Sequence, residues 1–298
     1  MIKNYFKTAF RSLWRHKNFA GINVAGLAVG IAVCLVIFLI IQFELSFDEF
    51  HSNKSRIYRL LSVSRNEDGE RKSAGVPYPV PVTLHNDFPS MLSTAVYSDR
   101  DDQIVIPDES NKGIQKKFKE EGGVFFVEPA FFKIFDFPLI AGEYSSLNEP
   151  NTAVLTKTTA ERYFGDWRLA IGKTFRRNSK DLFRITGIIA DPPSNTDLQV
   201  KIAASYATLK DFVTSTDWIS VASNHGCYIL LPENAKPSAM NSQVAAFFKK
   251  YHKSDEPEAR RNSLEIQSLS QVHYDADAGN FIDRTVSKNM INTMWLIA

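Results

Sequence analysis

The sequence predicts an α+β protein in which an N-terminal transmembrane helix is followed by a two-lobed mixed α/β exported domain. Three observations predict this class: a long uncharged apolar run near the N-terminus, positive charge concentrated before that run, and alternating short strand and helix patterns after it. Of the 298 residues, 44% are hydrophobic and 23% are charged, which excludes a disordered chain. The formal net charge of +2 argues against a generally basic nucleic-acid binder, so no nucleic-acid partner is expected.

Residues 1–18 are predicted to form a cytoplasmic amphipathic segment. Its apolar residues recur at helical spacing, at Ile2, Phe6, Phe10, Leu13 and Trp14. Its basic residues repeat every four positions on another face, at Lys3, Lys7, Arg11 and Arg15. Such a helix suits the membrane surface, because the aromatic rings reach toward acyl chains while the cations face lipid headgroups. The alternative is a positively charged flank without a defined helix.

Residues 19–43 are predicted to form a transmembrane helix. No charged residue lies between Lys17 and Glu44, and a helix over that run is about 39 Å long, more than the ~30 Å hydrocarbon core. A cleaved signal peptide is the competing interpretation, but its apolar core is shorter and ends in small residues, whereas this run ends in bulky ones. Cations before the run and acidic residues after it place the N-terminus in the cytoplasm and the rest of the chain outside.

Within this run, Gly26 and Gly30 form a GxxxG motif, and Ala28, Ala32 and Cys34 continue the small-residue face. Small residues four apart allow another helix to approach closely in lipid. A GxxxG motif alone is weak evidence, because glycine and alanine are common in membrane helices. We nevertheless expect Gly26 and Gly30 to pack against neighbouring helices.

Residues 44–288 are predicted to form the exported domain. Strand patterns occur at 56–64, 114–119, 123–128, 153–155, 174–177, 183–189, 228–231 and 263–269. Helical patterns occur at 79–87, 129–135, 156–164 and 238–251. The strands at 114–119 and 123–128 are expected to pair around a Gly-Gly turn, and those at 174–177 and 183–189 around residues 178–181. Gly165 is expected to end the helix at 156–164.

The final residues, 289–298, are uncharged and apolar but too short to span a membrane. We interpret them as the start of a second transmembrane helix that is truncated, so that the chain is a fragment of a longer protein. The alternative is a short C-terminal helix docked on the exported domain.

The sequence contains no strong catalytic or metal-binding motif, so we expect no enzyme activity and no cofactor. Gly172-Lys173-Thr174 ends like a phosphate-binding loop, but Trp167 stands where the motif requires glycine. His273, Asp275 and Asp277 alternate in a way that suits a divalent metal on a strand, yet a solvated loop is the favoured interpretation. Cys227 is predicted to be a buried strand residue.

Two further features concern the interior and movement of the exported domain. Phe125, Phe126, Phe131 and Phe132 are expected mainly in the core, with the lining of a cleft as the alternative. Three alternating prolines, Pro77, Pro79 and Pro81, mark a short extended segment. They are hinge candidates between lobes, with a rigid loop as the alternative.

Several motifs resemble those of FtsX-like permeases with a MacB-type periplasmic core domain, in the long form whose ATPase is a separate polypeptide. They are MIKNYFKTAFRSLWRHKNF at 1–19, NVAGLAVGIA at 23–32, FDEFH at 47–51, RIYR at 56–59, FFKIFDFP at 131–138, AERYFG at 160–165, IGK at 171–173 and ITGIIADPPSNT at 185–196. The matches follow the family's order over nearly the whole chain. The first block and residues 185–196 are the most specific.

The resemblance implies a non-catalytic permease subunit of a mechanically coupled ABC transporter in the inner membrane. Its partners would be a separate cytoplasmic ABC ATPase, a second permease copy or paired permease, membrane lipids and a periplasmic adaptor. It also implies a porter-like βαβ lobe at about 51–136 and 201–285 and an inserted lobe at about 137–200. The chain lacks the nucleotide-binding domain of MacB itself, and it ends before the segments that would engage an ATPase.

Two other functions fit the same topology. A sensor would place a ligand-binding domain between two membrane helices and signal to a cytoplasmic kinase or cyclase. A membrane-anchored exported enzyme would need ionisable residues clustered in a cleft, and no motif in the sequence indicates such a cluster.

Overall fold

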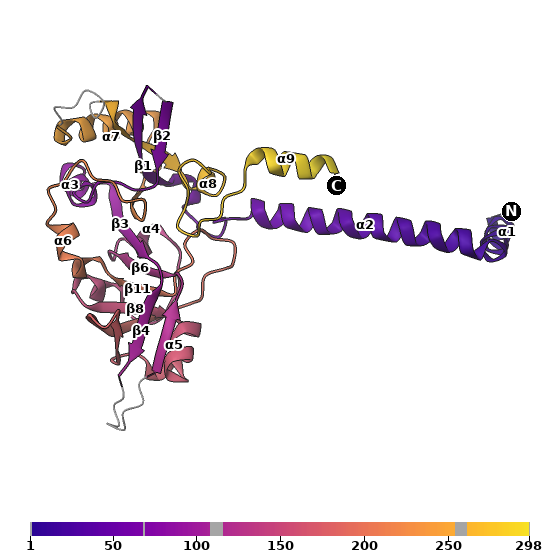
Figure 1. The fold of residues 1–298 in the computed structure, drawn as a ribbon, viewed down its shortest axis with the longest axis horizontal. Coiled ribbons are helices and arrows are strands. Elements are labelled where there is room, and N and C mark those ends of the chain that lie inside the picture. The colour runs from indigo at the N-terminus through magenta and orange to yellow at the C-terminus, as the bar shows by residue number, and fades with distance from the viewer. Residues whose placement is uncertain (1, 68, 108–115, 254–260, 298) are drawn as a thin grey trace. The chain divides into compact units, whose positions relative to one another are not determined.

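The computed structural model describes residues 2–67, 69–107, 116–253 and 261–297, and the chain divides into two units (Figure 1). One, here the helical unit, contains the residues up to Ser46 together with the segment from Val286. The other, here the sheet domain, is Phe47–Thr285. The predicted strand at 114–119 begins outside the described residues.

The helical unit contains α1 (Ile2–Arg15), α2 (Lys17–Leu45) and α9 (Lys288–Ile297). Of the described helices, α2 alone is long and apolar enough to cross a membrane, by length and composition. Its large apolar side chains, such as Leu27 and Val29, are mostly exposed, unlike those of a helix in a soluble core. Trp295 of α9 packs edge-on against Phe38 of α2, with ring centroids 6.2 Å apart, so α9 groups with the long helix.

The sheet domain is built on thirteen strands. They are β1 (Ile57–Asn66), β2 (Gly69–Ser73), β3 (Leu92–Asp99), β4 (Asp102–Ile106), β5 (Lys116–Glu120), β6 (Val124–Val127), β7 (Leu139–Gly142), β8 (Thr152–Thr156), β9 (Thr174–Arg177), β10 (Asp181–Ile189), β11 (Ile202–Ser205), β12 (His225–Leu230) and β13 (Ser263–Ser268). Their order is β13-β1-β12-β3-β6-β11-β8-β10-β9-β4-β5, with β2 on β1 and β7 on β10. The β10–β8 and β11–β6 pairs are parallel and the others antiparallel, which confirms a mixed α/β fold.

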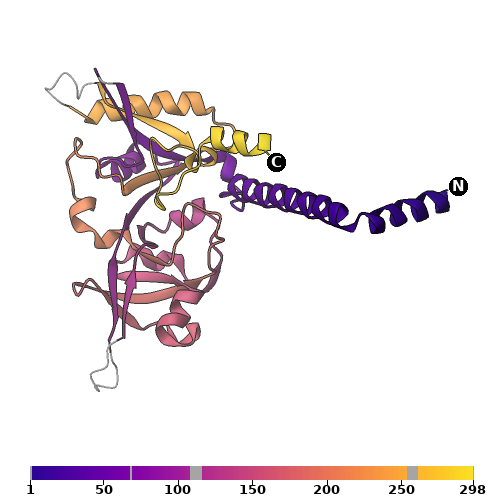
Figure 2. The same cartoon turned by 45° about the vertical axis from the view of Figure 1, so that its right-hand side comes forward.

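Helices cover both ends of this sheet (Figure 2). They are α3 (Val80–Asp87), α4 (Phe131–Ile134), α5 (Lys157–Phe164), α6 (Lys210–Val213), α7 (Pro237–Tyr251) and α8 (Leu269–Val272), with short 3-10 turns at Lys54–Arg56, Tyr144–Asn148, Trp167–Leu169 and Tyr206–Thr208. The side chains of α3 and α7 share a core with β1 and β12, and those of α5 share another with β8 and β10. The apolar faces of these helices are thus buried against the sheet.

The sheet curls back on itself at β3 and β4. Asp99 ends β3 and Asp102 begins β4, yet five strands lie between these two in the sheet order. Only a short turn joins β3 to β4, so these two strands stay close together. The five strands between them in the sheet order must therefore curve round from one to the other. Asp101, whose φ is +57°, lies at this corner. The curl encloses aromatic residues such as Phe126, Phe175 and Phe183, which are fully buried.

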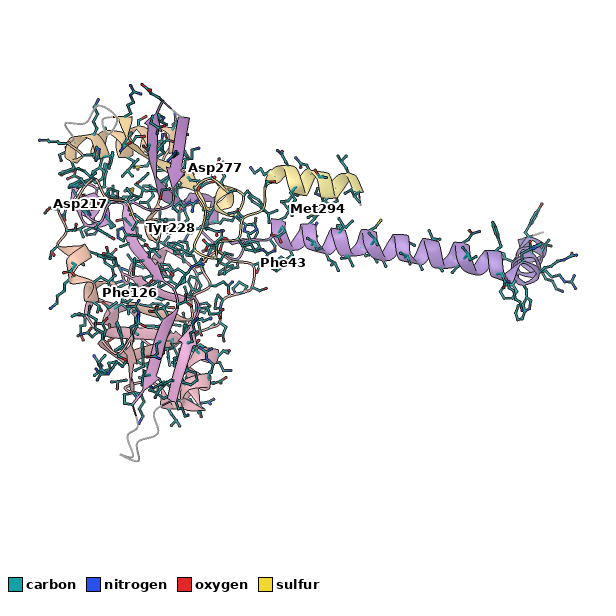
Figure 3. The ribbon with its side chains drawn as sticks, viewed as in Figure 1. Phe43, Phe126, Asp217, Tyr228, Asp277 and Met294 are labelled. Atoms are coloured by element: carbon teal, nitrogen blue, oxygen red, sulfur yellow. The ribbon has the colours of Figure 1, made fainter. Side chains whose placement is uncertain are left out.

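Several expectations are confirmed. The strands β9 and β10 pair as a hairpin, and Asn178 and Ser179 have φ of +50° and +56°, as a tight turn of this hand requires. Gly165 ends α5 with φ of +85°. Cys227 is buried on β12, and Phe126 and Tyr228 lie in the interior (Figure 3).

The expected β5–β6 hairpin is wrong. In the sheet β5 pairs with β4, while β6 lies between β3 and β11. Gly123 has φ of +94°, and a Cβ there would be 2.8 Å from the Gln199 carbonyl oxygen. The glycine therefore admits a neighbouring backbone segment instead of a hairpin turn. The division of this domain into two lobes stays a prediction.

Candidate functional site: a buried clamp at the two ends of the sheet domain

The two ends of the sheet domain are fastened to each other. Phe47 is the first residue after the helical unit's N-terminal part, and its ring stacks on His273 with centroids 3.5 Å apart. The guanidinium of Arg284, one residue before the end of the domain, lies 5.7 Å from the centre of the Phe47 ring. Phe47 and His273 are buried, so apolar burial and ring stacking both hold the contact.

Asp48 ties the N-terminal end to the segment that follows β10. Its backbone N–H donates to the Asn195 carbonyl oxygen at 2.9 Å, and its carboxylate accepts a hydrogen bond from the Thr196 hydroxyl. Asp48 is buried, and burial raises its pKa to about 7, with the nearby Asp197 charge adding to the rise. The carboxyl group therefore changes its charge near neutral pH.

Asp197 connects Asp48 to the C-terminal end. The Asp197 amide nitrogen lies 3.5 Å from Asp48 Oδ2. The Asp197 side-chain Oδ1 accepts from Asn280 Nδ2 at 2.9 Å and lies 3.2 Å from His273 Nδ1. Asn280 Nδ2 also donates to the Arg284 carbonyl oxygen at 2.6 Å, and Asn280 Oδ1 accepts from the Arg284 amide at 3.1 Å. We call Phe47, Asp48, Asp197, His273 and Asn280 the tether clamp.

His51 borders the clamp as a neutral side chain. Its Nδ1 accepts from the Asp136 amide at 3.0 Å, so its proton is on Nε2, which lies 3.8 Å from Asp48 Oδ1. Burial lowers the pKa of His51 to about 4. It therefore adds no positive charge beside Asp48 at neutral pH.

A second buried link joins β1 to the C-terminal end. Arg59 donates from Nε to Gln267 at 2.6 Å and from Nη1 to the Gly279 carbonyl oxygen at 2.7 Å. Gln267 in turn donates to Asp275 at 2.5 Å. Burial lowers the pKa of Arg59, while Tyr228, Asp275 and Asp197 favour its charged form.

The solvated-loop expectation for residues 273–277 is wrong for His273, which is only 2% exposed. The cause is Phe47, which covers the imidazole from a part of the chain more than two hundred residues away. Asp275 instead accepts hydrogen bonds from the Asp277 and Ala278 amides, and these bonds fix a turn. Among the described residues, no three His, Cys, Asp or Glu side chains are arranged to hold a metal ion.

The predicted membrane residues lie on the helical unit. A Cβ added at Gly26 or Gly30 would meet nothing within 4 Å. Both glycines line a groove of about 570 Å³ together with Phe38 of α2 and Trp295 of α9. On α1, the predicted surface side chains with a described position are exposed; they are Phe6, Lys7, Phe10, Arg11, Trp14 and Arg15. Lys3 lies on the same helix.

The three hinge candidates lie at the start of α3. Pro77, Pro79 and Pro81 are buried, and Pro79 occupies the N-cap position. The preceding Val76 is bonded twice to His225, by its amide at 2.8 Å and by its carbonyl oxygen, 2.9 Å from Nδ1. Movement at this segment would first have to break those two bonds.

Sequence reasoning missed the clamp, although its parts lay close to motifs already noted. Asp48 belongs to the FDEFH motif, and Asp197 directly follows ITGIIADPPSNT. Nothing in the local pattern of either motif indicates that they meet, because their contact depends on the order of the strands between them.

The fold defines a class of protein: a mixed α/β domain with one large mixed sheet, preceded by one long apolar helix. The profile of the MacB-like periplasmic core domain matches residues 20–247, so the chain belongs to that family, whose members are periplasmic domains of permeases. A domain described as part of a permease from Porphyromonas gingivalis has a TM-score of 0.60 at 17% identity, over 83% of this chain and 98% of that one.

The periplasmic region of MacB from Actinobacillus actinomycetemcomitans has a TM-score of 0.49 at 13% identity, over 74% of this chain and 91% of that one. At these identities the likeness concerns the fold alone. A comparison with curated protein sequences gave no significant match.

Proposed function

We propose that this chain is a non-catalytic permease subunit of a mechanically coupled ABC transporter of the MacB/FtsX type, which serves efflux or export. It relays ATP-driven motion from a separate cytoplasmic ATPase to its periplasmic domain. The observation that carries this proposal is the tether clamp, because it fastens the residues that follow α2 to the residues that precede α9. Family membership supports the same function.

The clamp suits a relay for a physical reason. Close-packed buried contacts transmit displacement instead of absorbing it, since side chains in an interior have little free space. A flexible connection would leave slack between a moving helix and the domain. Here Phe47 and Asp48, which follow α2 after Ser46 alone, already contact distant parts of the sheet domain. A shift of α2 or of α9 would therefore move the sheet domain through the clamp.

The chain is proposed to lie in the inner membrane with residues 1–18 cytoplasmic, 19–43 spanning and 44–288 periplasmic. Residues 289–298 would begin a second span, and the pairing of Trp295 with Phe38 supports that role. The cations Lys7, Arg11 and Arg15 would lie at the anionic inner surface. The open faces of Gly26 and Gly30 would pack against a helix of a second permease copy or paired permease.

Within residues 44–288, the porter-like lobe is assigned to about 51–136 and 201–285 and the inserted lobe to about 137–200. Pro77, Pro79 and Pro81 are the hinge candidates. A periplasmic adaptor would be a further partner. The alternative function is a membrane-bound sensor with a periplasmic ligand-binding domain, in which the same clamp would report ligand binding to the membrane helices.

The decisive experiment is purification of the protein from native membranes, with mass spectrometry of its partners and assay of ATP hydrolysis. We expect an ABC ATPase to co-purify, and nucleotide to change hydrogen exchange in the sheet domain. Asn280→Ala should weaken that nucleotide-driven change while hydrolysis continues, because it removes the bonds to Asp197 and to the Arg284 backbone. Asn241→Ala, which removes a side-chain bond to the Ile266 amide outside the clamp, is the control. A kinase partner, or no ATPase in mild detergents, would favour the sensor.

A further inference from the structure

A cavity of about 500 Å³ opens on the sheet domain beside the tether clamp. It forms where the end of β3, the residues before β12 and the loop 278–283 meet. Of its lining residues, Ala74, Ser98 and Ala278 are buried, whereas Arg100 and Asp283 are exposed. The volume lies in the range of about 300–1,000 Å³ that is usual for small-molecule sites.

Arg100 closes one side of this cavity by holding the loop. Its Nη1 lies 2.6 Å from Asp283 Oδ2, and its Nη2 donates to the Phe281 carbonyl oxygen at 3.2 Å. Half or more of each charged side chain is exposed, so water screens the ion pair and makes it weak. Asp283 also has a φ of +50°, a backbone conformation that side-chain-bearing residues rarely adopt. The ion pair is thus a contact that is easily exchanged, while Asn280 keeps the loop bonded to Asp197 and Arg284.

We propose that this cavity binds a small molecule that carries a carboxylate or phosphate group, and that the anionic group takes the place of Asp283 on Arg100. A guanidinium binds either group through paired hydrogen bonds. The polar side chains of Asn224 and Ser98 and the ring of Phe281 line the space for the rest of the ligand. The other carboxylate of the lining, Asp99, is already paired with Arg177 at 2.9 Å, so it opposes an incoming anion little.

Binding would be communicated to the tether clamp through Asn280. This residue lines the cavity and also donates to Asp197. Displacing Asp283 removes one of the contacts that hold the loop containing Asn280, so occupancy changes the hold on the C-terminal end of the domain. This consequence rests on the proposed relay function, whereas the binding itself does not.

The test is equilibrium binding to the full chain in detergent, with two anionic probes and their neutral counterparts. The probes are N-acetyl-trialanine with a free carboxylate against its amide, and glycerol 3-phosphate against glycerol. We expect saturable binding of an anionic probe only, and the two arms distinguish a carboxylate from a phosphate ligand. Arg100→Gln should weaken binding at least about tenfold, whereas Asp283→Asn should tighten it about two- to fivefold, because the competing carboxylate is gone.

The opposite signs of these two effects make the test specific. Arg184→Gln and Glu149→Gln, which remove an exposed ion pair of 3.3 Å elsewhere in the sheet domain, should change nothing. No binding of either probe, equal binding of neutral probes, or weakening by Asp283→Asn would overturn the proposal, once circular dichroism has shown each variant folded. The measurement uses no ATPase, so such a failure would leave the relay function standing.

Discussion

At the scale of single residues, Asp48 makes the stability of the sheet domain depend on pH. Its pKa is raised from 3.8 to about 7, so the folded protein binds a proton that the unfolded chain releases near pH 4. The contribution of Asp48 to stability should be greatest below pH 4, fall as pH rises between about 4 and 7, and then level off, by up to about 4 kcal/mol in all. His51, whose pKa is lowered to about 4, contributes in the opposite sense between about pH 4 and 6.5. Asp48→Asn should abolish the Asp48 part of the profile, because its amide stays uncharged.

Thermal unfolding of the full chain in detergent at pH 5 and pH 8 checks this. The variant should exceed the wild type in stability by about 4 kcal/mol at pH 8 and by about half of that or less at pH 5. Asp277→Asn, on an exposed side chain near the same loop, is the control and should follow the wild type. A variant that is destabilised equally at both pH values would show that hydrogen-bond loss, and not charge, decides the effect.

Arg177 and Asp102 form a buried ion pair where the curled sheet closes. Arg177 Nε lies 2.8 Å from Asp102 Oδ1, and the guanidinium lies over the Phe126 ring at 4.9 Å. Burial raises the pKa of Asp102, which Arg177 opposes. In a denaturant titration, Arg177→Gln should lower the free energy of unfolding by about 3 kcal/mol or more, because it leaves a buried carboxylate without its cation. Asp99→Asn, which removes the half-exposed partner of Arg177, should lose less than about 1 kcal/mol in the same denaturant titration.

At the scale of secondary-structure elements, two glycines separate backbone strain from crowding. Gly142 in β7 and Gly172 before β9 have φ of +85° and +83°. A Cβ on Gly142 would lie 2.1 Å from the Thr186 carbonyl oxygen in β10, whereas one on Gly172 would meet nothing within 4 Å. Gly172→Ala should therefore lower the free energy of unfolding by about 1 kcal/mol, from backbone strain alone.

Gly142→Ala should lose about 3 kcal/mol, because the strand β7 must also move away from β10. Chemical unfolding gives both values, and hydrogen exchange of the β10 amides should rise in the Gly142 variant only. Equal losses in the two variants would mean that β10 yields to the added methyl group.

The elements also show how far local sequence patterns reach. The helices at the N-terminus, at 79–87 and at 156–164, and the β9–β10 hairpin, follow from periodicity, caps and turn residues within a few positions. The strand β4 was missed, because its pairing with β9 joins chain segments more than seventy residues apart. Without β4, the local pattern assigned β6 to β5 as its partner. The tether clamp was missed for the same reason. Its Asp48, Asp197 and His273 are brought together only by the completed sheet.

At the scale of the whole molecule, the charge distribution predicts which side of the membrane each part occupies. Five cations and no acidic residue precede Glu44. In Ser12→Cys and Thr216→Cys variants, the new thiol lies at an exposed position of α1 or of the sheet domain. A membrane-impermeant maleimide added to intact spheroplasts should label the second variant only, and inside-out vesicles should show the reverse.

The wild-type chain gives the background for this labelling. Cys227 is fully buried and Cys34 lies in the apolar helix. Labelling of the Ser12 variant from outside would contradict the cytoplasmic placement of residues 1–18.

The closeness of the first and last residues of the sheet domain has an evolutionary consequence. A domain whose ends meet, as Phe47 and Arg284 do, can be inserted into or removed from a host chain without separating the flanking segments. A pair of helices could thus exchange one such insert for another and keep its own packing. We expect a graft of residues 47–285 into a loop of an unrelated host to leave that host folded.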